Sequence, residues 1–261
     1  MQGSTEVGGF VAGLLIAVVT SPVGISGAVF LLPVQLDVLG IPSPRVTPTN
    51  LLFNVVAVPG ALVRYRRRAA PFGALSRLLV VGTLPGVIAG AVIRVYLVPG
   101  VRPFRIIAGL VLFPLGAFVL ARRSGRDEGS QPPKSMTPGR ITVTAAGVDV
   151  VAGIYGIGGG SLMGPILVSS GFTVAAVAPA ALASTFITSV VGAIAYTVLG
   201  TLESGAVAPN WTVGFACGLG GLCGGYVGAH LQPRLPERVL QIVLGSLAMA
   251  LGMAYLAQGI A

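Results

Sequence analysis

A short glycine-rich segment occurs twice in this chain, and each copy interrupts an apolar stretch. The first copy, residues 24–27, reads Gly-Ile-Ser-Gly, and Pro33 follows it. The second copy, residues 156–160, reads Gly-Ile-Gly-Gly-Gly, and Pro165 follows it at the same spacing. Each glycine in a helix interior costs about 1 kcal/mol relative to alanine. We call the two segments the first and second break, and we expect the chain to leave its helical path at both.

The composition excludes an ordinary soluble domain. Of the 261 residues, 54% are hydrophobic and only 9% are charged, whereas soluble domains carry about 25% charged residues. The mean hydropathy is +0.92. The chain is therefore predicted to be a polytopic membrane protein. The net charge of +9 comes from basic residues between the apolar segments, where they set orientation in a bilayer, so we expect no nucleic-acid partner.

Neither cysteine nor histidine supplies a metal or redox site. Cys217 and Cys223 are six residues apart and do not share a helical face, which argues against a disulfide and a metal site. His230 is the single histidine. We therefore expect no metal and no cofactor. The amino terminus has Glu6 in place of a basic region, so the first apolar run does not resemble a cleaved signal peptide.

The apolar runs divide the chain into two similar halves. A helix needs about 20 residues to span a bilayer. Three runs in each half are long enough or nearly so, and the first two of each half, which meet at the break, are predicted to be half-helices. The runs cover residues 7–21, 24–39, 46–63, 72–97 and 103–121, then 140–157, 159–172, 174–199, 208–231 and 235–258.

Residues of the two halves correspond in the same order, which indicates an internal duplication. The corresponding pairs include Gly24 with Gly156, Pro33 with Pro165, Gly82 with Gly220, Gly86 with Gly224, Gly90 with Gly228, Gly109 with Gly245, Gly116 with Gly252 and Arg102 with Arg238. Glycines four residues apart make a smooth helix face that permits backbone contact between helices. We expect a first membrane repeat at residues 1–121, a cytoplasmic linker at 122–139 and a second membrane repeat at 140–261.

The distribution of basic residues favours an inverted arrangement of the repeats. If each broken segment re-enters without crossing, Arg234 and Arg238 join most other basic residues on the cytoplasmic side. Only Arg45, Arg94, Arg102 and Arg105 then face outward. If each broken segment crosses, the repeats are parallel and Arg234 and Arg238 move outside, which the positive-inside rule disfavours. The predicted fold is thus an all-α polytopic membrane protein of two inverted repeats, each a broken, re-entrant half-helix pair plus three transmembrane helices.

The breaks are candidate anion sites. A broken helix exposes backbone groups that lipid cannot satisfy, so such backbone is tolerated only inside protein or beside a polar cavity. Half-helices that start near Gly27 and Gly159 direct their amino ends, with free N–H groups and partial positive charge, at the break. The candidate ligand residues are Gly24, Ile25, Ser26, Gly27, Gly156, Gly158, Gly159 and Gly160. The alternative is that these glycines serve only tight helix packing.

A second polar cluster follows each break. In the first half it contains Thr49 and Asn50, with Asn54 one turn later, and in the second half Ser184 and Thr185. Neutral donors on one helix face suit an oxyanion, whose oxygens accept hydrogen bonds. Thr49, Asn50, Ser184 and Thr185 are therefore added to the substrate-binding candidates. The alternative is bonding between helices or to the preceding turn, and it weighs equally for the neighbouring Thr188 and Ser189.

Asp149 is the acidic residue placed within an apolar run of the second half. An ionisable residue in a membrane segment is a functional hypothesis by default, and here it predicts a proton-coupling group. The competing interpretation places Asp149 near the cytoplasmic end, paired with Arg140 or the linker. Tyr155, just before the second break, either donates its hydroxyl to the ligand or packs as an apolar ring.

The chain resembles the TauE/SafE sulfite exporter family. The resemblance rests on Gly156-Ile157-Gly158-Gly159-Gly160-Ser161 with Pro165, on Ala183-Ser184-Thr185, and on the first-half version Ser21-Pro22-Val23-Gly24-Ile25-Ser26-Gly27 with Pro33. It implies a multi-pass carrier in the bacterial inner membrane for sulfite, an organosulfonate or a related sulfur oxyanion. Such a carrier works by alternating access between inverted repeats. The expected partners are this small anion and the bilayer, and a homo-oligomer stays open.

The chain also departs from a symmetric pattern. Ser26 and Ala28 stand where the second break has glycines, and Thr49-Asn50 stands where the second half has Ala183-Ser184. We therefore expect two chemically unequal half-sites, and the identity of the substrate does not carry over from the resemblance.

Two other functions compete with transport. An intramembrane serine protease would use Ser26, in the sequence Gly-Ile-Ser-Gly, with His230 as its base. The correspondence of Gly158 with Ser26 argues instead for a backbone role at that position. A membrane accessory protein without transport is the other alternative, but it leaves two broken helices unexplained. The sequence favours a transporter and not an enzyme.

Overall fold

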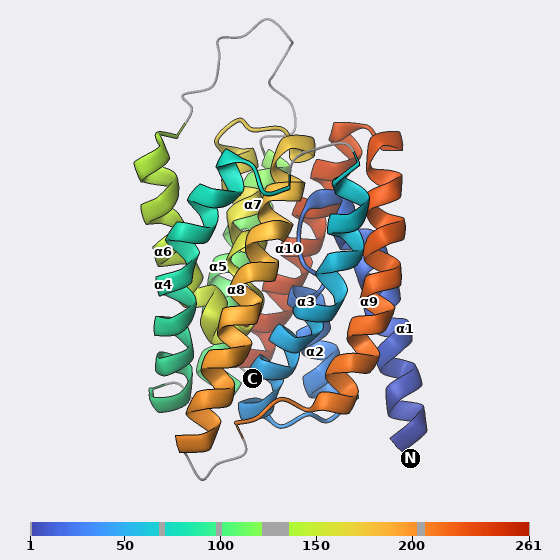
Figure 1. Ribbon diagram of the computed structural model, residues 1–261, viewed down its shortest axis with the longest axis vertical. Helices are drawn as coiled ribbons and strands as arrows, with labels where there is room; N and C mark the ends of the chain where they lie inside the picture. Colours follow the sequence, from blue (N-terminus) through green and yellow to red (C-terminus); the bar gives the residue numbers. More distant parts are fainter. Residues whose placement is uncertain (1, 68–70, 98–100, 122–135, 203–206, 261) are drawn as a thin grey trace, which may run out of the picture.

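The structure is a computed structural model that describes residues 2–67, 71–97, 101–121, 136–202 and 207–260, and the regular structure in these ranges is helical (Figure 1). The long helices are α1 (Gln2–Thr20), α3 (Ser43–Tyr65), α4 (Ala74–Tyr96), α5 (Val101–Ala121), α6 (Pro138–Tyr155), α8 (Val174–Leu202), α9 (Trp211–Leu231) and α10 (Glu237–Ile260). Two short helices follow the breaks, α2 (Ala28–Pro33) and α7 (Gly159–Ser169). Single turns of other helix types cover Ser21–Val23, Val34–Val38 and Gln232–Arg234.

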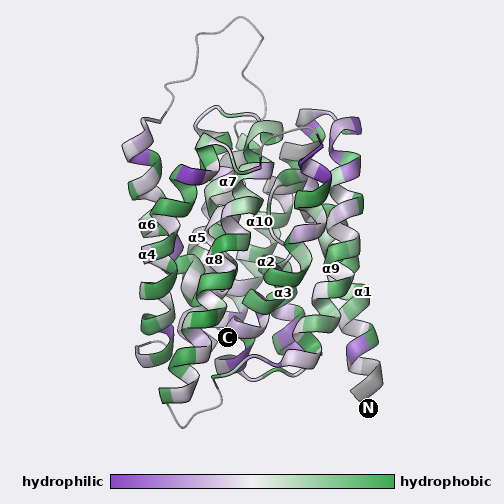
Figure 2. Cartoon of the chain, viewed as in Figure 1, coloured by the Kyte–Doolittle hydropathy of each residue, from purple (hydrophilic) through white to green (hydrophobic). Residues whose placement is uncertain are grey.

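The predicted class, an all-α membrane protein, is confirmed. Among the described residues, five helices are long and apolar enough to cross a bilayer: Thr5–Val23, Arg45–Tyr65, Ala74–Tyr96, Val174–Leu202 and Trp211–Arg234. Figure 2 shows apolar residues along the lengths of the helices and hydrophilic residues gathered towards both ends of the bundle. Large apolar side chains such as Val81 and Ile88 are exposed on the outside, as lipid-facing positions require.

The prediction that both runs flanking the first break are half-helices is wrong for the first of them. The span Thr5–Val23 has 19 residues, enough to cross a bilayer by its length. Its glycines do not end it, because a glycine lowers helix stability by only about 1 kcal/mol and neighbouring helices compensate. The short member is α2, with six residues, which a single π turn extends to Val38. In the second half, α6 has 18 residues and α7 has 11.

The glycine stripes hold two helix pairs at backbone contact, as their spacing predicted. On α4, Cβ atoms added at the stripe positions would overlap backbone carbonyls of α6, and on α9 they would overlap carbonyls of α1. The contacts are Gly82 with Thr142, Gly86 with Ala146, Gly90 with Val150, Gly220 with Phe10, Gly224 with Leu14 and Gly228 with Val18. Each stripe therefore joins a helix of one half to a helix of the other.

The helix contacts of one half recur when each helix is replaced by its counterpart in the other half. Helix α1 packs on α9 as α6 packs on α4, and α3 packs on α9 as α8 packs on α4. The corresponding helices α3 and α8 pack on each other, and so do α5 and α10. In Figure 1 the two chain ends lie at the same lower end of the bundle, and α3 and α8 run in opposite directions. This arrangement supports the duplication, and the inverted relation of the repeats stays a prediction. Most of the expected linker, residues 122–135, lies outside the described residues.

Candidate functional site

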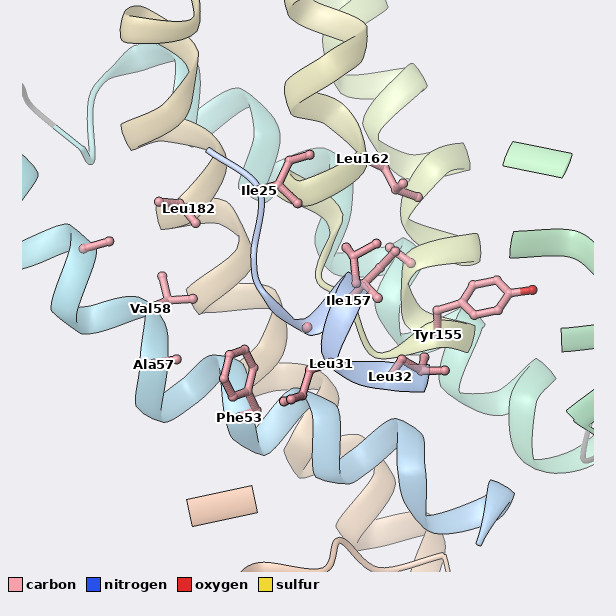
Figure 3. Close-up of a cluster of buried hydrophobic side chains, with 14 of the residues drawn as sticks. Ile25, Leu31, Leu32, Phe53, Ala57, Val58, Tyr155, Ile157, Leu162 and Leu182 are labelled. Carbon is pink, nitrogen blue, oxygen red and sulfur yellow. The ribbon is translucent and has the colours of Figure 1, made fainter. Parts of the chain in front are cut away.

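The two breaks lie against each other inside the bundle. The amide of Ser26 donates to Ser161 Oγ at 3.1 Å, and Asn54 Nδ2 donates to the carbonyl of Gly156 at 3.5 Å. Every residue of both breaks is buried. In Figure 3 the side chains of Ile25 and Ile157, one from each break, lie in a single apolar cluster. Residues about 130 positions apart in the sequence thus form one site.

The first glycine of each break ends the preceding helical segment in the left-handed conformation. Gly24 has φ 75° and Gly156 has φ 68°. Each also packs on a helix of the other half, so an added side chain has no room. A Cβ at Gly24 would lie 2.7 Å from the Cβ of Ala178 on α8, and one at Gly156 would lie 3.0 Å from Thr47 Cγ2 on α3. Both positions require glycine for two reasons, backbone conformation and close approach.

A buried tyrosine caps the carbonyl end in each half. Tyr65 of α3 donates its hydroxyl to the Ser21 carbonyl at 3.0 Å, and Tyr196 of α8 donates to the Gly153 carbonyl at 3.0 Å. Both carbonyls lie three residues before the first glycine of a break. Tyr65 is buried, with a side chain that is 4% exposed. Tyr196 satisfies the Gly153 carbonyl, which the end of α6 leaves without an intrahelical partner, whereas the Ser21 carbonyl also accepts from the Gly24 amide at 3.1 Å.

The carbonyl one residue later also accepts a hydrogen bond in both halves, but from a different type of side chain in each. Gln232 Nε2 donates to the Pro22 carbonyl at 2.7 Å. In the second half, Thr47 Oγ1 donates to the Ile154 carbonyl at 3.2 Å, and Arg94 Nε donates to Thr47 Oγ1 at 3.4 Å. The sequence assigned Arg94 to the outward-facing side of the membrane, and within the bundle its side chain is buried, 3% exposed. A cation next to the carboxyl end of α6 is favourable, since that end carries a partial negative charge.

We expect Tyr196→Phe to destabilise the protein more than Tyr65→Phe. Tyr196→Phe leaves the buried Gly153 carbonyl without its donor, which costs about 1–3 kcal/mol, whereas in Tyr65→Phe the Ser21 carbonyl keeps the Gly24 amide. Thermal unfolding of the purified protein in detergent measures the effect. Tyr96→Phe is the control, because Tyr96 is exposed. Unchanged unfolding temperatures for both buried variants would contradict the capping role.

The amino end of α7 presents backbone donors that the fold leaves unused. Within the described part of the chain, the amides of Gly158, Gly159 and Gly160 form no hydrogen bond, and the first bonded amide is that of Ser161, which donates to the Gly158 carbonyl at 3.0 Å. Gly158 has φ 73°, which turns the chain into α7. Three free amides at the start of an 11-residue helix form a polar, electropositive surface.

Polar side chains from several helices surround these amides. A Cβ at Gly160 would lie 2.7 Å from Thr185 Oγ1, and one at Gly158 would lie 3.2 Å from Ser189 Oγ. A Cβ at Gly159 would lie 2.5 Å from the carboxyl carbon of Asp149. All three side chains are fully buried, and neither Ser189 Oγ nor the carboxyl oxygens of Asp149 have a hydrogen-bond partner.

The amino end of α2 is closed by side chains of its own half. Ser26 Oγ donates to Asn54 Oδ1 and accepts a bond from the Ala28 amide at 3.1 Å. Asn50 Nδ2 donates to the Ala28 carbonyl at 2.8 Å, and its Oδ1 has no partner. The two half-sites are therefore unequal, as the difference between Ser26 and Gly158 indicated. In the described part of the chain, three amides are free at the second break, whereas at the first break the amides of Ser26 and Ala28 are engaged and that of Gly27 is free.

Of the remaining ligand candidates from the sequence, some lie at the second break and others lie elsewhere. Ser184 Oγ lies 3.2 Å from Thr83 Oγ1 of α4, beside the second break. Thr188 bonds back to the Ser184 carbonyl at 2.9 Å, as the structural alternative predicted. Thr49 lies elsewhere, since its hydroxyl donates to the Arg45 carbonyl and accepts from the amide of Asn210, the residue before α9.

Three polar residues of the cluster were missed by the sequence reasoning as ligand candidates: Thr83, Ser161 and Asn54. Thr83 lies next to Gly82 of the stripe, and Ser161 directly follows the second break. Both could therefore have been identified as ligand candidates from their positions in the sequence. Asp149 does not pair with Arg140, since neither of its carboxyl oxygens has a hydrogen-bond partner.

Two small cavities flank the breaks. Each has a volume of about 10 Å³, room for roughly one water molecule. One is apolar and is lined by residues that include Val29, Tyr155 and Ile157. The other is lined by residues that include Ser26 and Gly27. A multi-atom ligand therefore needs the surrounding helices to separate before it reaches the breaks.

Comparison with known proteins gives one match. The family model described as Sulfite exporter TauE/SafE matches residues 9–255, nearly the whole chain. A search of curated proteins found no match, and a search of solved structures also found none.

Proposed function

Because the chain belongs to the TauE/SafE sulfite exporter family, we propose that it is a multi-pass carrier that moves a small sulfur oxyanion across the bacterial inner membrane. Sulfite and organosulfonates are the candidate substrates. Transport proceeds by alternating access of the breaks to the two sides of the membrane. The observation that carries the proposal is the set of three unpaired amides at Gly158, Gly159 and Gly160, buried among hydroxyl groups.

The chemistry of this cluster matches an oxyanion. The amino end of a helix carries roughly half a positive charge and is a ready site for an anion. Hydroxyl groups of Ser184, Thr185 and Ser189 surround it and supply neutral donors. Sulfite and sulfonate oxygens only accept hydrogen bonds, so they match a site built of donors. Buried N–H groups without partners are costly, which supports their use by a ligand.

The packing supports a rocking motion for access. The stripe-bearing pairs, α1 with α9 and α4 with α6, touch backbone to backbone, and in the proposed motion each pair moves as one unit. Each pair contains one helix from each half. Helices α3 and α8 lie between the pairs and carry the polar clusters. Movement of one pair against the other would open the breaks to one side of the membrane at a time, as in other inverted-repeat carriers.

The protease alternative has little support. The Ser26 hydroxyl donates to Asn54 and accepts from the Ala28 amide, so it serves the start of α2. The family to which the chain belongs consists of transporters and not of enzymes. The accessory-protein alternative gives no role to the unpaired amides at the second break.

Flux into proteoliposomes tests the proposal. We expect radiolabelled sulfite to enter vesicles that contain the purified protein, with saturation and with competition by unlabelled methanesulfonate. Protein-free vesicles are the control for leakage, and the assay is run with and without a pH gradient. Lack of flux for every sulfur oxyanion and sulfonate tested would contradict the proposed function.

We expect Asn50→Leu to weaken substrate binding by about tenfold or more, which corresponds to about 1.4 kcal/mol. The change leaves the Ala28 carbonyl without its donor and removes a buried polar group beside the breaks. Titration of the purified protein with methanesulfonate measures the dissociation constant. Thr197→Val is the control, because the exposed Thr197 hydroxyl donates to the Ala193 carbonyl of its own helix. Wild-type affinity in Asn50→Leu would remove Asn50 from the site.

A further inference from the structure

Resting on the proposed function, we infer that Asp149 is a built-in competitor of the substrate at the amino end of α7. In its charged form the carboxylate occupies the electropositive surface that the anion needs. In its neutral form it leaves that surface to the anion. Where Asp149 is ionised in the free carrier, binding of one anion is therefore accompanied by uptake of one proton.

The geometry places the carboxyl at the first turn of α7. Asp149 projects from α6, and its side chain is fully buried. A Cβ added at Gly159 would lie 2.5 Å from the carboxyl carbon and 2.5 Å from Thr83 Cγ2. A Cβ added at Gly86 of α4 would lie 2.8 Å from the Asp149 Cβ. The Asp149 side chain thus lies close to the backbone of Gly86 on one side and of Gly159 on the other, at the helix end whose amides form no hydrogen bond to any described residue.

The charge of the Asp149 carboxyl makes anion binding at this helix end depend on pH. A carboxylate and a bound oxyanion at the same helix end repel each other strongly, because a buried site screens charge poorly. A neutral carboxyl group removes this repulsion and adds one O–H donor, which an oxyanion accepts. Binding of the anion therefore favours the protonated form of Asp149, and protonation favours binding to the same extent.

No charged group compensates Asp149 in the part of the chain that the structure describes. The charged and titratable residues on the packed helices are Arg77, Arg94 and Tyr96 on α4, Arg140 and Tyr155 on α6, Arg102 and Arg105 on α5 and Tyr196 on α8, and α7 has none. Asp149 forms an ion pair with none of them. Arg94 lies eight residues beyond Gly86 on α4, about 12 Å along the helix axis.

The first half has no equivalent acid. Asp149 lies seven residues before the first glycine of its break, and the residue at the same distance from Gly24 is Ala17. Ala17 is buried and lines the small cavity that includes Gly27. A proton-binding carboxyl is therefore present at one break and not at the other, which sets the expected number at one proton per anion.

The test measures binding of methanesulfonate as a function of pH. This probe keeps a single negative charge across the range, so any pH dependence belongs to the protein. For the wild type we expect the affinity to fall by about tenfold per pH unit where Asp149 loses its proton. We expect Asp149→Asn to bind at all pH values with the affinity of the wild type at acid pH. Asp37→Asn is the control, since Asp37 pairs with Arg105 away from the breaks, and its pH profile should match the wild type.

A second measurement uses the wild type alone, so that it does not depend on the folding of a variant. In weak buffer, at a pH above the fall in affinity, each bound methanesulfonate should cause the uptake of one proton, which a pH-sensitive dye measures. A flat affinity profile, a pH slope retained in Asp149→Asn, or the absence of proton uptake would each overturn the assignment to Asp149. These outcomes still show anion binding and so leave the proposed function intact, whereas no binding at any pH contradicts the proposed function itself.

Discussion

Gly159→Ala lowers anion transport by about tenfold or more in proteoliposomes, while the protein still inserts and purifies like the wild type. The new Cβ would overlap the carboxyl of Asp149 and the methyl group of Thr83, both fully buried. Crowding of this kind typically costs about 1–3 kcal/mol. Alanine is the better helix former, so α7 itself is not weakened. The loss therefore arises at the start of α7, where the free amides lie. A β-branched residue at this position should abolish transport completely.

Gly164→Ala is the matched control in the same helix. A Cβ at Gly164 would meet only the Gly24 carbonyl at 3.8 Å and the Ala181 Cβ at 3.9 Å, which are ordinary contacts. We expect transport by this variant to stay within about twofold of the wild type. Equal losses in both variants would show that α7 tolerates no added atoms anywhere, and the specific role of its amino end would be contradicted.

Gly156→Ala should cause the largest loss of stability among the single substitutions considered. Its φ of 68° costs a non-glycine residue about 1–2 kcal/mol. The added Cβ would also overlap the backbone carbonyl of Thr47, which the helix around it holds in place. We expect a loss of about 3 kcal/mol or more, since crowding adds to the conformational cost. Thermal unfolding in detergent and the yield of folded protein measure it.

Gly40→Ala separates the two causes. Gly40 has φ 64°, almost the same backbone conformation, but nothing lies within 4 Å of an added Cβ. This variant should lose only the conformational cost of about 1–2 kcal/mol. If Gly40→Ala and Gly156→Ala are destabilised equally, contact between the second break and α3 contributes nothing.

The sequence predicted the elements that depend on local backbone chemistry. Glycine is needed where the chain turns left-handed, so Gly24 and Gly156 mark both breaks by residue type alone. The four-residue glycine spacing on α4 and α9 predicted backbone contact between helices, because periodicity places these positions on one face. The length of α1 was not predictable in this way, since tertiary contacts stabilise a helix across glycines that weaken it.

The partners of the broken helices could not be predicted, because they come from other helices. Tyr65 and Tyr196 make equivalent hydrogen bonds, yet the alignment that pairs Asn50 with Ser184 does not pair these two tyrosines. Arg94 has the charge of a surface anchor, and only the packing of α4 against α6 shows that it is buried. A signal for Asp149 was present in the sequence, but its contact with Gly159 requires the three-dimensional arrangement.

The most direct test of the central claim is the position of a bound anion in an experimental structure. Crystals grown with bromomethanesulfonate would locate the ligand through the anomalous signal of its bromine. We predict a peak beside the amides of Gly158, Gly159 and Gly160, with the sulfonate oxygens within hydrogen-bond distance of them. A peak confined to arginine side chains at the ends of the bundle, with the second break closed and dry, would contradict the claim that these amides bind the transported anion.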